Sequence, residues 1–196
     1  DVDEALEVLK LSEKLRGEAE SNRELASSPT MPTLERFTGV LYDALDAPTL
    51  PPEARSYLAV GDALFGLVRA DDLIPHYRLS GSTKLGGRTL KSRWGTAITD
   101  ELRALVAAGE FLIDMRSGTY QQLGKLKDAA TVRVETVQED GSRKVVSHFN
   151  KHYKGELARV LALHGEGVSS LKDAASVAQE AGMSTELRGT ELLLVV

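Results

Sequence analysis

Residues 64–85 read LFGLVRADDLIPHYRLSGSTKL. This stretch places two arginines, one lysine and a pair of aspartates between apolar residues and turn formers. A helix that packs into a core does not mix charges and turn residues in this way. The stretch therefore predicts an ordered loop that presents positive charge, with short extended segments within it.

The composition is that of a globular protein. The 196 residues are 42% hydrophobic and 27% charged, which is enough to bury a core in one domain or in two small ones. The formal net charge is −5 and the pI is about 5.5, so the chain as a whole lacks the strongly basic character of many nucleic-acid-binding proteins. Any binding of nucleic acid must come from a local patch.

Two basic segments stand inside this acidic chain. Residues 69–93 carry six bases and two acids, and residues 143–159 carry five bases and one acid, so each segment has a net charge of +4. Residues 1–30 are acidic, with eight acids against four bases. The basic segments are the places where we expect anions to bind.

Cysteine is absent from the sequence, which excludes disulfides, thiolate metal sites, cysteine-held iron–sulfur clusters and thiol peroxidase chemistry. No apolar run approaches the roughly 20 residues of a membrane span, so we expect a cytoplasmic protein that does not bind membranes. The chain begins without methionine and without a basic-then-apolar signal segment. We expect that the start of the natural protein is missing.

The apolar spacing predicts helices and strands that are interleaved without regular alternation. The predicted helices cover residues 3–25, 52–67, 89–108, 150–164 and 171–181. The predicted strands cover residues 111–115, 131–137, 144–149 and 190–196, the middle two forming a hairpin. This order predicts an α+β fold, a single compact domain with a mixed sheet surrounded by helices, with α/β as the alternative.

Five separate motifs occur one after another along the chain. They are FTGVLYDALD at residues 37–46, the stretch 64–85, a Trp-Gly pair at 94–95 within residues 90–98, DMRSGTY at residues 114–120, and a basic helix within residues 144–159. The motifs run from residue 37 to residue 159. On these motifs the sequence resembles the YaaA peroxide-stress family.

The resemblance implies a compact α+β protein of the bacterial cytoplasm that responds to hydroperoxide, limits free iron and protects DNA. It also implies a basic cleft able to bind DNA. Family chains open with a strand that carries a Ser-Pro-X-Lys or Pro-Pro-Ser-Glu-Gly-Lys segment, which this sequence lacks. We therefore expect residues 1–196 to form one YaaA-like domain without the N-terminal part of the family domain and without one basic residue of the cleft.

Phosphate binding needs several arginines or lysines that converge from different segments, because each contact neutralises one phosphate. The candidates are Arg69, Arg78, Lys84, Lys151, Lys154 and Arg159. We expect weak, sequence-tolerant DNA binding at these residues. The competing interpretations are solvated surface charges and, for Arg78, a salt bridge to Asp71 or Asp72.

An enzyme that acts on a small anionic substrate in the same cleft is the alternative function. Its candidate catalytic residues are Asp114, Arg116 and Tyr120, an acid, a guanidinium and a phenol near the predicted groove. The competing interpretation is a structural Asp–Arg pair that closes the loop. A third possibility is an interaction protein whose acidic helix within residues 1–25 docks a partner.

Common catalytic and cofactor patterns are incomplete or missing. Residues 81–84 read GSTK, which lacks the Gly-Lys-Ser/Thr order of a phosphate loop, and the sequence has no Gly-X-Ser-X-Gly elbow. His148 and His152 have the i, i+4 spacing of a metal pair, but no third ligand is identifiable. We therefore predict neither a cofactor nor a metal site.

Overall fold

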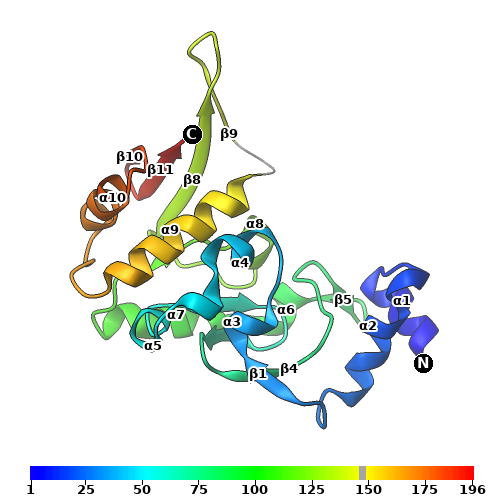
Figure 1. The fold of residues 1–196 in the computed structure, drawn as a ribbon. Helices are drawn as coiled ribbons and strands as arrows, with labels where there is room; N and C mark the ends of the chain where they lie inside the picture. Colours follow the sequence, from blue (N-terminus) through cyan, green and yellow to red (C-terminus); the bar gives the residue numbers. More distant parts are fainter. Residues whose placement is uncertain (146–148) are drawn as a thin grey trace. The chain divides into compact units, whose positions relative to one another are not determined.

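The computed structural model describes residues 1–145 and 149–196. The chain forms two compact units, each assembled from three segments. Unit 1 contains Asp1–Arg36, Ala59–Leu102 and Arg116–Lys125, and unit 2 contains Phe37–Leu58, Arg103–Met115 and Leu126–Val196. Both units combine helices with strands (Figure 1), which confirms the predicted α+β class.

Unit 1 contains short helices and three antiparallel strand pairs. Its helices are α1 (Val2–Leu9), η1 (Glu13–Leu15), α2 (Arg16–Ser21), η2 (Asn22–Glu24), α3 (Thr33–Arg36), α6 (Leu90–Trp94), α7 (Ala97–Ala107, whose last residues belong to unit 2) and α8 (Gly118–Gln121). The strands pair as β1 (Thr30–Pro32) with β4 (Leu73–Pro75), β2 (Ala59–Asp62) with β3 (Gly66–Arg69), and β5 (Lys84–Leu85) with β6 (Arg88–Thr89). The stretch 64–85 thus gives one strand to each pair, as its predicted extended segments require.

The helix predicted over residues 52–67 is wrong beyond its first turn. Only α5 (Pro52–Arg55) is helical, and the chain then forms the β2–β3 hairpin. The Asp62 Oδ1 atom holds the hairpin turn, because it accepts hydrogen bonds from the backbone N–H groups of Leu64 (2.6 Å) and Phe65 (2.8 Å). A turn closed by a side chain therefore overrides the helical spacing.

Two other predicted helices are interrupted by residues with positive φ. The helix predicted over residues 3–25 ends early because Lys10 adopts a left-handed conformation (φ 55°) and its N–H caps the carbonyl of Glu7. The helix predicted over residues 89–108 is divided between α6 and α7 at Gly95, which has φ 56°. Shorter helices lie on each side of these breaks.

Unit 2 is built on a five-stranded mixed sheet. Its helices are α4 (Val40–Leu45), η3 (Ala47–Thr49), α5, α9 (Asn150–His164) and α10 (Leu171–Glu180). The strand order is β10 (Thr185–Arg188), β11 (Glu191–Val195), β8 (Ala130–Val137) and β7 (Ile113–Asp114), with β9 (Arg143–Val145) also pairing with β8. Strands β7 and β11 run parallel to β8, whereas β9 and β10 run antiparallel to their partners. This arrangement confirms the predicted mixed sheet with helices.

Most of the predicted elements of unit 2 are confirmed. The helix predicted over residues 150–164 is α9, and the predicted strands 131–137 and 190–196 correspond to β8 and β11. Strand β9 accounts for part of the prediction over residues 144–149, of which 146–148 lie outside the described residues. Strand β10 was not predicted. Among the described residues, no helix is both long and apolar enough to cross a membrane.

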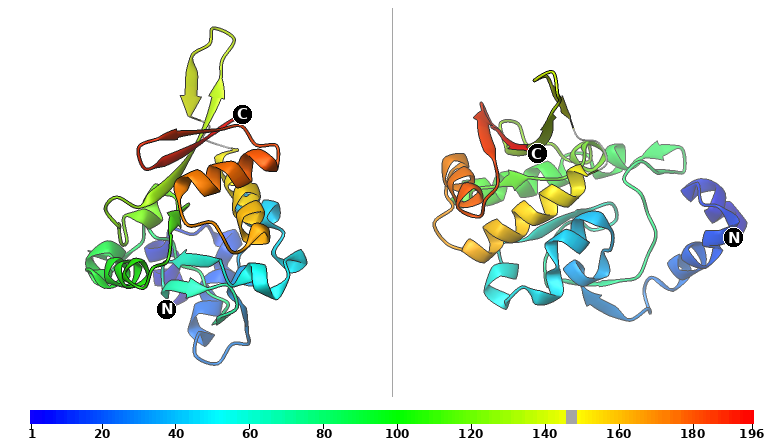
Figure 2. Two further views of the ribbon diagram at one scale, coloured as in Figure 1. Left: turned by 90° about the vertical axis from the view of Figure 1, so that its left-hand side faces the viewer. Right: turned by 45° about the horizontal axis from the view of Figure 1, so that its top comes forward.

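The core of unit 2 lies between the sheet and two helices. Helices α9 and α10 pack against the sheet (Figure 1 and Figure 2). The sheet contributes Val132, Val134, Leu192 and Leu194, and the helices contribute Leu157, Ala174, Ala175 and Ala178. The alanines of α10 allow a close approach to the strands, so this aliphatic core fixes the position of α9, which carries several of the predicted site residues.

Candidate functional site

Arg78 lies on a loop that unit 1 holds in place. Its backbone N–H donates to Oδ1 of Asn22 (2.7 Å), and its carbonyl accepts from Nδ2 of the same side chain (2.9 Å). Arg78 is exposed, and within the described part of the chain its guanidinium forms no hydrogen bond or ion pair. The alternative prediction, a salt bridge to Asp71 or Asp72, is therefore not formed among these residues.

Asp72 instead shapes the turn after β3. Its Oδ2 atom accepts a hydrogen bond from the backbone N–H of Arg69 (2.7 Å), and its carbonyl accepts from the N–H and the hydroxyl of Thr33 (2.9 Å each). The side chain of Arg69 is exposed, as is that of Lys84 in β5. Unit 1 therefore presents Arg69, Arg78 and Lys84 to solvent.

Tyr120, predicted as a catalytic residue, lies beside the loop that carries Arg78. Burial raises the pKa of Tyr120, and the negative charge of Asp62 adds to this effect. A hydrogen bond with the Gly81 backbone and the positive charge of Arg78 act in the opposite direction. The structure thus brings together one predicted catalytic residue and one predicted anion-binding residue.

Arg116 has a structural position in unit 1. Its guanidinium donates to the carbonyl oxygens of Tyr120 (3.5 Å) and Gly124 (2.8 Å), which closes the end of α8. Arg116 and Tyr120 belong to unit 1, whereas Asp114 ends β7 in unit 2. The convergence of these three residues in a catalytic group stays a prediction.

Lys154, one of the predicted cations on α9, is half-buried. Its Nζ donates to the carbonyl of Met115 (3.3 Å). Burial lowers the pKa of Lys154, and the carboxylates of Asp114 and Glu191 offset part of that effect. The ammonium group therefore already has a partner at the end of β7, which reduces its availability to an external anion.

Arg159 and Lys151 differ sharply in their surroundings. The Arg159 Nη1 atom donates to the carbonyl oxygens of Leu45 (2.9 Å) and Asp46 (3.1 Å), so Arg159 caps the C-terminal end of α4. Lys151 is exposed, and its ammonium group forms no hydrogen bond or ion pair with the described residues. On α9, Lys151 is thus the cation best placed to meet a phosphate.

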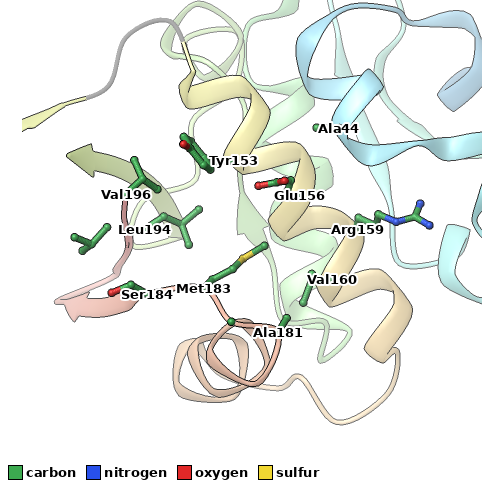
Figure 3. Close-up of a pocket in the computed structure, with 12 residues that line it drawn as sticks. Ala44, Tyr153, Glu156, Arg159, Val160, Ala181, Met183, Ser184, Leu194 and Val196 are labelled. Atoms are coloured by element: carbon green, nitrogen blue, oxygen red, sulfur yellow. The ribbon is translucent and has the colours of Figure 1, made fainter. Parts of the chain in front are cut away.

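A cavity of about 540 Å³ lies in unit 2 beside α9. Its lining comes from α4, α9, the turn after α10 and the end of β11 (Figure 3). Much of that lining is apolar, and Figure 3 shows Arg159 extending away from Leu194 and Met183 toward α4. Glu156, which also lines the cavity, is paired with His152 (3.2 Å). An apolar cavity with a carboxylate does not suit an anionic ligand.

The possible histidine metal pair cannot be traced as a pair, because His148 lies outside the described residues. His152 contacts Glu156 on the next turn of α9. Within residues 1–145 and 149–196, no group of three or more His, Cys, Asp or Glu residues is arranged to hold a metal ion.

The sequence patterns did not identify two residues that organise unit 1, Asn22 and Asp62. Asn22 holds Arg78 from 56 positions away, so no local pattern could have revealed it. Asp62 is almost fully buried and accepts a hydrogen bond from the hydroxyl of Tyr77. Asp62 is followed four residues later by Gly66, a spacing compatible with a hairpin turn. This spacing was the sequence signal that could have predicted the β2–β3 turn.

Comparison with known proteins supports the motif-based resemblance. The family described as Peroxide stress protein YaaA matches residues 1–181. A UPF0246 protein of Corynebacterium glutamicum is 62% identical over 191 residues, covering 95% of this chain and 77% of that protein. A UPF0246 protein of Streptomyces coelicolor is 42% identical over 185 residues, covering 89% and 70%. The chain therefore belongs to the Peroxide stress protein YaaA family.

Proposed function

We propose that this protein acts in the cytoplasmic defence against peroxide by binding DNA weakly and without sequence preference, and so helps to limit iron-dependent oxidative damage. Membership of the peroxide stress family supports the biological role. The observation that carries the DNA-binding part is the exposed Arg78 guanidinium, which has no acceptor in the described chain although Asn22 fixes its backbone. A guanidinium on a fixed backbone is well suited to grip phosphate oxygens.

Exposed cations of each unit are assigned the main part in DNA binding. Unit 1 contributes Arg69, Arg78 and Lys84, and unit 2 contributes Lys151. Lys154 and Arg159 donate to backbone carbonyls, so we assign them a structural role together with a weaker, long-range electrostatic one. Because the whole chain carries a net charge of −5, binding must depend on a few local contacts and must weaken steeply with salt.

We expect replacement of Lys84 and Lys151 by alanine to reduce DNA affinity and its salt dependence. Each lost phosphate contact should lower the slope of log affinity against log salt by about 1. Both side chains are exposed, so the melting temperature should change little. Fluorescence anisotropy with one labelled duplex, at several salt concentrations, measures the slope for each single variant and for the double variant.

Lys172→Ala is the matched control. Lys172 is an exposed lysine of α10, so this substitution removes the same charge as each of the other two. Its slope should equal that of the unmodified protein. A double variant that keeps both the affinity and the slope of the unmodified protein would contradict the assignment of these two lysines to DNA binding.

We also expect the purified protein to carry no stoichiometric iron and to consume no peroxide on its own. The sequence has no cysteine, and the described residues contain no three-ligand cluster of the kind that holds a metal. Protection would then act through the bound DNA. Metal analysis and a peroxide consumption assay test this expectation, and peroxide turnover that disappears in His152→Ala would refute it.

A further inference from the structure

A second, smaller pocket lies in unit 1 next to the loop that carries Arg78. It has a volume of about 270 Å³ and is lined by the C-terminal end of α1 and by the loop that follows Tyr77. The lining residues are Val8, Leu9, Lys10 and Leu11 on one side and Arg78, Leu79, Ser80, Ser82 and Thr83 on the other. This volume is below that of sites for drug-sized ligands, roughly 300–1,000 Å³, and suits a small group.

The polar side chains of this pocket are positively charged or neutral, and each of them can donate a hydrogen bond. Arg78 and Lys10 supply two cations, and the described lining includes no carboxylate. Neither cation has a side-chain partner among the residues that the structure describes. Three hydroxyls stand beside them, and those of Ser80 and Ser82 are 3.1 Å apart. The positive charge and the hydrogen-bond donors of the lining therefore both favour binding of an anion.

The loop side of the pocket is fixed in advance of any ligand. Asn22 makes two hydrogen bonds to the backbone of Arg78, and the Thr83 N–H closes a turn by donating to the carbonyl of Ser80 (2.9 Å). Gly81 is buried against α8, where a Cβ would stand 3.3 Å from Thr119. A site held in this way loses little conformational entropy when it binds.

The helix side presents Lys10 at the end of α1. A helix C-terminus normally disfavours an anion, because its last carbonyls carry partial negative charge. Here the carbonyls of Glu7 and Leu6 accept hydrogen bonds from the N–H groups of Lys10 (3.1 Å) and Leu11 (2.9 Å). This capping reduces the negative field of the helix end beside Lys10, which lines the pocket.

We propose that this pocket binds the phosphate of a phosphomonoester, with Arg78 and Lys10 neutralising its two charges and the hydroxyls of Ser80, Ser82 and Thr83 donating to its oxygens. A carboxylate has two oxygens and one charge, which leaves several of these donors without an acceptor. Leu79 and Leu11 add apolar surface to the lining beside these polar groups. The pocket goes beyond the proposed DNA contacts, although it shares Arg78 with them.

Titration calorimetry with inorganic phosphate tests the pocket directly. We expect saturable binding to one site, an affinity at least about tenfold lower in Lys10→Asn, and a clear loss in Arg78→Lys, which keeps the charge but removes the planar fork. Asparagine tolerates the left-handed conformation at position 10, so the cap of α1 should survive. Lys14→Asn, an equal change of charge at an exposed residue outside the pocket, should bind as the unmodified protein does.

The source of the phosphomonoester is resolved by comparing oligonucleotides with a 5′-phosphate and with a 5′-hydroxyl. Tighter binding of the phosphorylated strand, lost in Lys10→Asn, supports the pocket and identifies a strand end as its ligand. Saturable binding of phosphate and of adenosine monophosphate, with no effect of the 5′-phosphate, supports it with a free phosphomonoester as the ligand. Absence of saturable phosphate binding, or equal affinities in Lys10→Asn and Lys14→Asn, overturns the proposal.

The two proposals fail separately. If the pocket is wrong but DNA binding is right, the duplex still binds with a salt slope that falls in the Lys84 and Lys151 variants, while phosphate does not saturate. If DNA binding is wrong but the pocket is right, phosphate binding and its loss in Lys10→Asn remain. Lys10 is not among the residues assigned to the DNA interface, so its variant reports on the pocket alone.

Discussion

Alanine at position 155 is expected to lower the free energy of unfolding of unit 2 by about 2 kcal/mol. Gly155 lies in α9, where an added Cβ would stand 2.8 Å from the Cβ of Ala44 and closer still to the carbonyl oxygen of Leu41. A backbone oxygen cannot swing aside as the end of a long side chain can, so α4 must shift away from α9. Alanine forms helices better than glycine, by about 1 kcal/mol, and this offsets only part of the strain.

Urea unfolding followed by circular dichroism measures the loss of unfolding free energy caused by Gly155→Ala. The single tryptophan, Trp94, belongs to unit 1, so its fluorescence reports separately on that unit. Gly17→Ala is the control, because Gly17 is a helical glycine with open space around it, and it should stabilise the protein slightly. Adding Ala44→Gly to Gly155→Ala should restore part of the loss. A Gly155→Ala protein with an unchanged or higher urea midpoint would show that α4 and α9 are not tightly packed.

The sequence predicted the secondary structure best where one apolar spacing continued over a whole element. Helix α9 was predicted with its observed bounds, because Tyr153, Leu157, Val160 and Leu161 keep a helical spacing that the single glycine, Gly155, does not interrupt. The prediction over residues 52–67 was wrong because Asp62 offers the backbone an acceptor that competes with helical hydrogen bonds. Apolar spacing alone could not detect that competition.

The sequence identified cations as candidates for the site, but it could not separate their roles. Arg159 and Arg78 have the same side chain, yet Arg159 caps α4 by donating to Leu45 and Asp46, which lie more than 110 positions away. Arg78 is held instead through its backbone, which is hydrogen-bonded to the Asn22 side chain, and it lines the small pocket together with Lys10. Such pairings join segments that are distant in sequence, so they depend on the tertiary fold and leave no local pattern.

Replacing Asp62 with alanine is expected to lower the free energy of unfolding of unit 1 by about 3 kcal/mol, because it leaves several donors without their acceptor. Asp62 is 2% exposed, and its carboxylate accepts hydrogen bonds from the N–H groups of Leu64 and Phe65 and from the hydroxyl of Tyr77. The carboxylate therefore ties the β2–β3 turn to the segment just before Arg78. Urea unfolding followed by Trp94 fluorescence measures the effect closely, since the indole N–H of Trp94 donates to the carbonyl of Ala63 (3.0 Å).

Two milder variants separate the contacts of Asp62. Asp62→Asn keeps one oxygen for the two backbone N–H groups, so it should lose clearly less stability than Asp62→Ala, and Tyr77→Phe should lose about 1 kcal/mol because it removes only the phenolic donor. The loop that carries Arg78 begins one residue after Tyr77, so phosphate binding should weaken in Asp62→Ala even at temperatures where the protein remains folded. A stability of Asp62→Ala equal to that of the unmodified protein would mean that the turn does not depend on this carboxylate. In that case the position of Arg78 would rest on Asn22 alone, and Asn22→Ala would be the variant that abolishes phosphate binding.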